Sequence, residues 1–227
     1  MFLAGLTASL NQIGHVQAHL SSSLAVVMAI VGIGAAWVPG VWNVLWPVST
    51  IAHEGAHAVV GSAMGRKITG MEIKLDGGGT SHEGDPGTLF RLPVTFAGYF
   101  GPSAFGIGAA ELIRIGHIVA VLWIGLLGLL PVLYLARKSF GIILVIAAVV
   151  ALLLVLGGGS LGTQVVIAYA VTWFLLGSGL RVLNIRGNDS SDGAALKEMT
   201  GLPQWFWLPF WLTGTVAALI FGATLLL

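Results

Sequence analysis

The chain has 227 residues, of which 56% are hydrophobic and 8% are charged, against about 45–50% and about 25% in soluble proteins. Its formal net charge of +1 offers no basic surface for a nucleic acid, and the absence of cysteine excludes disulfides, thiolate metal sites and cysteine nucleophiles. The composition therefore predicts an all-α polytopic membrane protein, in which any metal ion must be held by histidine and carboxylate.

The first 21 residues are less apolar than the segments that follow. Met1–Leu20 contains no Lys or Arg, so it lacks the basic region that begins a signal peptide. We expect a retained interfacial segment. His15 and His19 stand four residues apart there, which is compatible with a metal pair, but the polar face of an amphipathic stretch at the membrane surface is the favoured interpretation.

Seven apolar runs are long enough to cross a bilayer, which takes about 20 residues. Short turns separate several of them, including Pro39-Gly40, Arg137-Lys138 and the glycine-rich turn that ends at Ser160. We therefore expect a single membrane domain over residues 1–227 with about seven transmembrane helices. The runs are Ser22–Val38, Val41–Met64, Thr88–Ile113, His117–Ala136, Phe140–Leu156, Leu161–Leu180 and Gln204–Leu227.

Two polar stretches interrupt the apolar pattern, at 65–87 and 181–203. In the first, apolar and polar residues partly alternate over 68–75 and a glycine-rich turn follows, which predicts a short β-hairpin. We expect His82 and Glu83 to lie in an exposed loop near that turn. The second stretch is predicted to be a loop that contains a short helical segment.

The basic residues of the short loops predict the orientation of the chain in the membrane. With a cytoplasmic N-terminus, Arg114 is the only one of the 10 Lys and Arg residues outside. Both polar stretches then lie on the cytoplasmic face of a multi-pass protein, which we expect in the cell (plasma) membrane. The residues on that face are Arg66, Lys67, Lys74, Arg91, Arg137, Lys138, Arg181, Arg186 and Lys197.

The pattern His-Glu-x-x-His, formed by His53, Glu54 and His57, lies inside an apolar helix. Two histidines four residues apart lie one turn apart on the same helix face, so both imidazoles can reach one zinc ion. Glu54 lies beside them and can take a proton from a zinc-bound water. Buried polar groups are costly in lipid without a partner, so this pattern favours a metal site over a buried histidine pair.

A catalytic zinc ion usually has a third protein ligand and an open position for water. Asp192 is the favoured candidate, because it lies in the polar stretch on the membrane face toward which the histidine helix runs. His57 lies seven residues before Met64, which places it about 10 Å inside that face. Asp189 is the alternative ligand. Either acid could instead be a loop residue or the N-cap of a helix that begins before Ala194.

The chain resembles the site-2 proteases, a family of intramembrane zinc metalloproteases, and in particular their short B branch without a PDZ domain. The string from His53 to Ala58 is similar to the zinc helix of the family, and a hairpin follows that helix in the family as it is expected to here at Lys67–Thr80. Asn184 stands eight residues before Asp192, the spacing of the family's Asn and zinc-binding Asp. The resemblance therefore favours Asp192 over Asp189.

The resemblance implies a Zn²⁺ enzyme that hydrolyses a peptide bond in or near a transmembrane segment of a membrane-protein substrate. His53, His57 and Asp192 would bind the metal and Glu54 would be the catalytic residue. The chain departs from the family pattern at Phe105, which replaces a polar Asn, and at two further positions. Those positions are Gly187, in place of Pro, and Ser191, in place of an apolar residue.

Two alternative functions follow from these observations. The departures are compatible with a proteolytically inactive zinc-binding membrane protein of the same fold. A transporter of metal or small solutes is disfavoured, because the sequence has no visible inverted repeat and no ladder of intramembrane acids.

Overall fold

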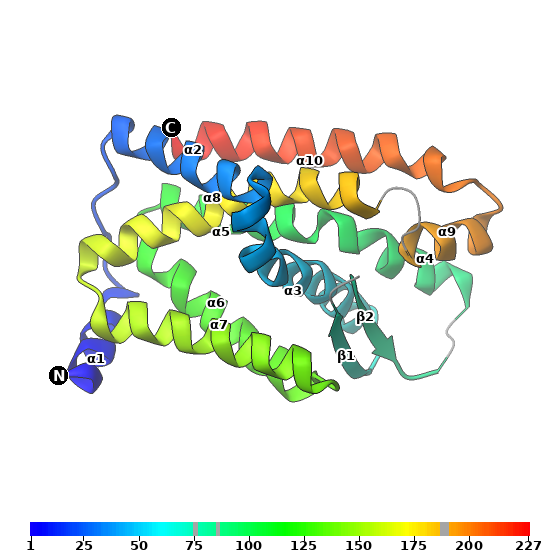
Figure 1. The fold of residues 1–227 in the computed structure, drawn as a ribbon, viewed down its shortest axis with the longest axis horizontal. Helices are drawn as coiled ribbons and strands as arrows, with labels where there is room; N and C mark the ends of the chain where they lie inside the picture. Colours follow the sequence, from blue (N-terminus) through cyan, green and yellow to red (C-terminus); the bar gives the residue numbers. More distant parts are fainter. Residues whose placement is uncertain (75–76, 85–86, 187–190) are drawn as a thin grey trace.

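The chain forms a bundle of helices with one small β-hairpin (Figure 1). The computed structural model describes residues 1–74, 77–84, 87–186 and 191–227. The predicted helical class and the predicted hairpin are both confirmed. The elements are α1 (Phe2–Gln12), α2 (Ser22–Trp37), α3 (Pro39–Ala63), β1 (Ile68–Lys74), β2 (Gly77–His82), α4 (Thr88–Ala97), the 3-10 helix η1 (Gly98–Phe100), α5 (Gly101–Arg114), α6 (Ile118–Leu135), α7 (Ser139–Gly158), α8 (Leu161–Arg186), α9 (Ser191–Thr200) and α10 (Gln204–Leu226).

Four helices of the described part of the chain are long and apolar enough to cross a membrane, namely α6, α7, α8 and α10. A fifth candidate span is the pair α2 and α3, whose axes meet at 91°. The chain is therefore a helical protein with several candidate spans, but the expected count of seven is not confirmed. Two features account for the difference, the corner between α2 and α3 and a break within the expected run Thr88–Ile113.

The corner between α2 and α3 follows from a proline. Val38 has an extended backbone (φ −78°, ψ 116°), as is usual for a residue before proline, and Pro39 begins α3 at a position where its missing N–H costs nothing. Arg181 of α8 braces this corner, because its guanidinium lies 5.7 Å from the ring of Trp37 and 5.1 Å from that of Trp42. Helix α3 therefore begins at this corner as a helix separate from α2.

The expected run Thr88–Ile113 is divided into α4, η1 and α5. The 3-10 turn begins at Gly98, and α5 begins with Gly101 and Pro102. A proline in the first turn of a helix lacks only an N–H that would have no partner there, so it favours a new helix start at this point. The break brings the start of α5 against α3, since a Cβ on Gly101 would lie 2.5 Å from the Ala52 carbonyl oxygen.

The hairpin is held between α3 and the pair α6 and α7. Met71 and Ile73 of β1 are buried and pack in one cluster with Val145 of α7. The outer edge of β1 is covered by the chain after α6, where Arg137 donates its backbone N–H to the Met71 carbonyl (3.0 Å). Within the described residues the sheet has two strands, and no strand lies beside the outer edge of β2.

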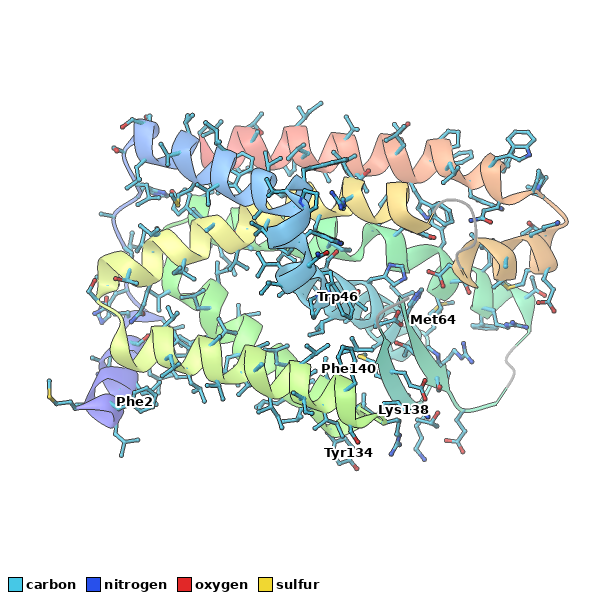
Figure 2. All side chains as sticks on the ribbon, viewed as in Figure 1. Phe2, Trp46, Met64, Tyr134, Lys138 and Phe140 are labelled. Carbon is cyan, nitrogen blue, oxygen red and sulfur yellow. The ribbon has the colours of Figure 1, made fainter. Side chains whose placement is uncertain are left out.

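The rings of Trp46 on α3 and Phe140 on α7 are stacked, with centroids 6.3 Å apart (Figure 2). This contact fixes α3 beside the start of α7. The C-terminal half of α3 and the hairpin lie at one end of the molecule together with α4 and α9, and both chain termini lie at the other end (Figure 1). The elements that carry the candidate site are therefore gathered at a single end.

The N-terminal segment packs on the far end of the bundle. Ser9 of α1 is buried and donates to the Gln164 side chain of α8 (2.7 Å), and Gln17 accepts from the backbone N–H of Val119 (3.0 Å). His15 is exposed, and His19 lies 3.3 Å from the Tyr169 hydroxyl. This segment docks through buried polar contacts rather than through an apolar face alone.

Candidate metal centre

Three ligand atoms meet at the C-terminal half of α3. His53 Nε2 donates to Asp192 Oδ2 across 2.8 Å, and His57 Nε2 lies 3.4 Å from the same oxygen. The two Nε2 atoms lie 3.3 Å apart. Both imidazoles are buried, and 15% of the Asp192 side chain is exposed. Asp192, which lies 139 residues after His53, therefore completes a triangle of ligand atoms with the two histidines.

This triangle has the dimensions of a metal site. Ligand atoms that are about 2.0–2.1 Å from a tetrahedral ion lie about 3.3 Å from one another, which is the separation of the two histidine nitrogens. Two imidazoles and one carboxylate suit Zn²⁺, and three protein ligands leave a fourth position for water. His53, His57 and Asp192 could hold zinc with only a small widening of the shortest edge.

The orientation of the His57 ring is fixed from its far side. Its Nδ1–H donates to the backbone carbonyl of Val94 in α4 across 2.7 Å. A hydrogen bond at Nδ1 selects the tautomer whose Nε2 carries a lone pair, and that atom faces His53 and Asp192. His57 is therefore prepared to bind a metal through Nε2.

An aromatic cluster positions Asp192 and His53. Leu196 of α9 is fully buried against Tyr99 and Trp211, which fixes the helix whose first turn carries Asp192. The ring of Tyr99 meets the His53 ring edge to face at 5.3 Å. Packing of α9 against η1 and α10 thus places the carboxylate over the histidine pair.

The Asp192 carboxyl lies outside the candidate spans, on α9. Burial acts to raise its pKa, but the hydrogen bonds to His53 and His57 and their charges hold the pKa below its usual range. The carboxylate is therefore ionised at neutral pH, as a metal ligand must be.

Glu54 lies on the same turn of α3 and is also buried. One ligand atom from each of His53, Glu54 and His57 can be chosen so that all three lie within 4.8 Å of one another. The hydroxyl of Thr80 on β2 donates to the Glu54 carboxylate (3.0 Å) and is within 3.1 Å of its backbone carbonyl. The hairpin therefore fixes the carboxylate beside the histidine pair.

Gly78 of β2 packs directly on the Glu54 side chain. A Cβ at Gly78 would lie 2.6 Å from Glu54 Oε1, whereas a Cβ at Gly79 would meet no atom within 4 Å. We expect Gly78→Ala to displace the carboxylate and to lower hydrolysis by about 10²-fold or more, as a lost general base does, with the metal retained. Cleavage rate and bound metal measure this effect. Gly79→Ala is the control, and equal rates for the two variants would contradict the prediction.

Gly98 is a site residue that sequence reasoning did not identify. A Cβ at Gly98 would lie 2.5 Å from His57 Nε2 and 2.6 Å from His53 Nε2. The absence of a side chain lets η1 lie against the two ligand nitrogens. The apolar pattern carries no signal for this contact, because the contact exists only once η1 has packed on α3.

The structure places some of the other residues singled out from the sequence and corrects one expectation about them. Asp189 and Gly187 lie outside the described residues. Phe105 of α5 approaches α3, where its ring lies 3.7 Å from the Cβ position of Gly55. The expectation of an exposed loop at His82 was wrong, because His82 ends β2 and its Nε2 is buried beside α3. In a strand every second residue faces the same side, so His82 faces α3 together with Gly78 and Thr80, whereas a loop imposes no such direction.

A family model described as Peptidase M50B-like matches residues 25–222. The match therefore includes all of α3, the hairpin and α9. Neither a curated protein nor a solved structure shows a significant match to the chain.

Proposed function

Since the chain belongs to the Peptidase M50B-like family, the family of membrane metalloproteases to which the site-2 proteases belong, we propose that it is an intramembrane zinc metalloprotease. The proposed reaction is hydrolysis of a peptide bond in or near a transmembrane segment of a membrane-protein substrate. The observation that carries the proposal is the approach of Asp192 to the two Nε2 atoms, at 2.8 and 3.4 Å, beside a buried glutamate.

In the proposed mechanism His53, His57 and Asp192 hold zinc. Zinc bound there would lower the pKa of a bound water and polarise the scissile carbonyl. Glu54 accepts a proton from the water that attacks the carbonyl carbon, and delivers it to the amine nitrogen as the C–N bond breaks. Thr80 holds the Glu54 carboxylate in place through its hydroxyl.

We propose that the substrate binds in an extended form along β2. A helical peptide keeps its amides hydrogen-bonded, so the substrate helix must unwind before the bond can be attacked. The outer edge of β1 is covered at Arg137, whereas β2 carries the residues that touch Glu54 and has no further strand beside it within the described residues. Addition of the substrate as a third strand would supply backbone hydrogen bonds near the reacting groups.

The orientation of the protein is part of the proposal. We place the end of the molecule that carries the hairpin in the cytoplasm of a multi-pass plasma-membrane protein. The N-terminus lies at the opposite end of the molecule (Figure 1), so this placement does not keep the expected cytoplasmic N-terminus. Support comes from the basic residues of that end, among them Arg66, Lys67, Arg91 and Lys138. The cleaved segment would then be released toward the cytoplasm.

Removal of the Asp192 carboxylate tests the metal site. We expect about one zinc per chain in the wild type and a large loss of zinc in Asp192→Ala, because two imidazoles alone hold zinc weakly. Elemental analysis of the purified protein gives the stoichiometry. Glu198→Ala is the matched control, since Glu198 is an exposed acid on the same helix α9. Full zinc content in Asp192→Ala would remove Asp192 from the ligand set.

The same preparations separate the proposed function from its alternative. Cleavage of a designed transmembrane peptide by the zinc-loaded wild type supports a protease. Zinc at full stoichiometry without cleavage supports the inactive zinc-binding protein, for which the apolar Phe105 ring beside Gly55 is the favouring observation.

A further inference from the structure

A cavity of about 230 Å³ opens beside the candidate metal centre. One wall belongs to the site itself and includes His57 and Asp192. The rest of the lining comes from the turn before β1, from β2 and from α4. The lining residues are His57, Arg66, Thr80, His82, Arg91, Val94, Thr95 and Asp192.

The charge of this cavity differs from that of the surrounding bundle. Among its described lining residues are two guanidinium groups, Arg66 from the turn before β1 and Arg91 from α4, and one carboxylate, Asp192. Asp192 is already hydrogen-bonded to an imidazole. Arg66 therefore places a positive charge in the lining of the cavity.

Arg66 has hydrogen-bonding capacity that the described residues do not use. Its Nη2 donates to the Gly84 carbonyl at 3.3 Å, near the limit for a hydrogen bond. Its Nε is buried and has no hydrogen-bond partner among the residues that the structure describes. A buried donor without a partner is unfavourable, so the geometry favours a ligand that brings acceptor oxygens to this guanidinium.

We propose that this cavity binds an acidic side chain, Asp or Glu, of the substrate close to the scissile bond. The inference rests on the proposed function and deepens it by naming a substrate preference. A guanidinium presents parallel N–H donors that match a carboxylate. The volume is below that of cavities for whole small molecules, about 300–1,000 Å³, and it suits one side chain of a larger substrate. Because His57 and Thr80 also line it, its occupant lies beside the reacting groups.

Peptide binding tests this preference without requiring turnover. Glu54→Gln protein in phosphatidylcholine nanodiscs is mixed with fluorescent transmembrane peptides that carry a single Asp or Asn, moved one position at a time through the segment. We expect about tenfold tighter binding of the Asp peptide at one or two adjacent positions, the usual scale of one charge-assisted hydrogen bond. Equal binding of both members of every pair, including no binding of either, would overturn the proposal.

Arg66 variants assign the preference to the cavity. In the Glu54→Gln background, Arg66→Gln should remove the Asp preference, and Arg66→Glu should reverse it in favour of a Lys peptide, an outcome that misfolding would not produce. Lys67→Gln is the control, because Lys67 is the next residue, is 78% exposed and pairs with Glu83 at 3.2 Å. Loss of the preference in Lys67→Gln, or its retention in both Arg66 variants, would contradict the assignment.

Cleavage of the same peptides by the wild type keeps the two proposals distinguishable. Equal cleavage of Asp and Asn peptides, with equal binding, would leave a protease without this acidic subsite. A binding preference that depends on Arg66, without cleavage of any peptide, would leave the subsite and remove the protease assignment.

Discussion

Glu54→Gln should abolish peptide hydrolysis while the protein keeps its metal. Glutamine has nearly the shape of glutamate but cannot accept the proton of the attacking water, and general acid–base catalysis contributes about 10²–10⁴-fold to a rate. Thr80 can still hydrogen-bond the amide oxygen, so the surroundings of the side chain should persist. The measurements are cleavage of a designed transmembrane peptide and zinc content by elemental analysis.

His57→Ala should instead lose metal and activity together, because it removes one of the three atoms of the candidate site. Glu83→Gln is the control for Glu54→Gln, because Glu83 is exposed and pairs with Lys67 rather than with a residue of the site. Wild-type cleavage by Glu54→Gln would refute the assigned role of Glu54. Loss of zinc in that variant would indicate that Glu54 is a ligand.

Gly98→Ala should weaken metal binding although it adds only one methyl group. That methyl would lie 2.5 Å from His57 Nε2 and 2.6 Å from His53 Nε2, closer than real Cβ contacts allow. The His57 ring cannot move freely, because Val94 holds its Nδ1, so either the rings or η1 must shift. Displaced ligands typically cost about 10–100-fold in metal affinity. Competition with a zinc chelator measures this change.

Gly108→Ala is the matched control for Gly98→Ala. Gly108 lies in α5, ten residues further along, and a Cβ there meets no atom within 4 Å. We expect Gly108→Ala to bind zinc as the wild type does. Equal affinity in both variants would show that η1 yields to the added methyl group, and that Gly98 does not control the site.

The effects expected at Gly98 and at Gly78 have the same structural cause. Helix α3 supplies His53, Glu54 and His57, but glycine contacts from other elements set how closely the backbone approaches them. Gly98 of η1 lies on the imidazoles and Gly78 of β2 lies on the Glu54 carboxylate. Small substitutions at these two positions are therefore expected to separate metal binding from proton transfer, since each glycine touches a different group.

The local part of the site could be predicted from the sequence. The spacing of His53 and His57 places both imidazoles on one helix face whatever the rest of the chain does, because the helical period is a property of neighbouring residues. The hairpin was predictable for a similar reason, since alternation and glycine act over a few residues. Long apolar runs likewise indicate helices in lipid, which is why α6, α7, α8 and α10 were expected.

Only the tertiary structure decided which distant groups meet these local elements. The resemblance singled out Asp192, but its distance from His53 depends on the packing of α9 on Tyr99 and Trp211. The turn at Pro39 was predicted, but hydropathy did not reveal that α2 and α3 form one bent candidate span, nor did it reveal the break at Gly98. Contacts between segments far apart in sequence arise from packing, and packing leaves no periodic signal in either segment.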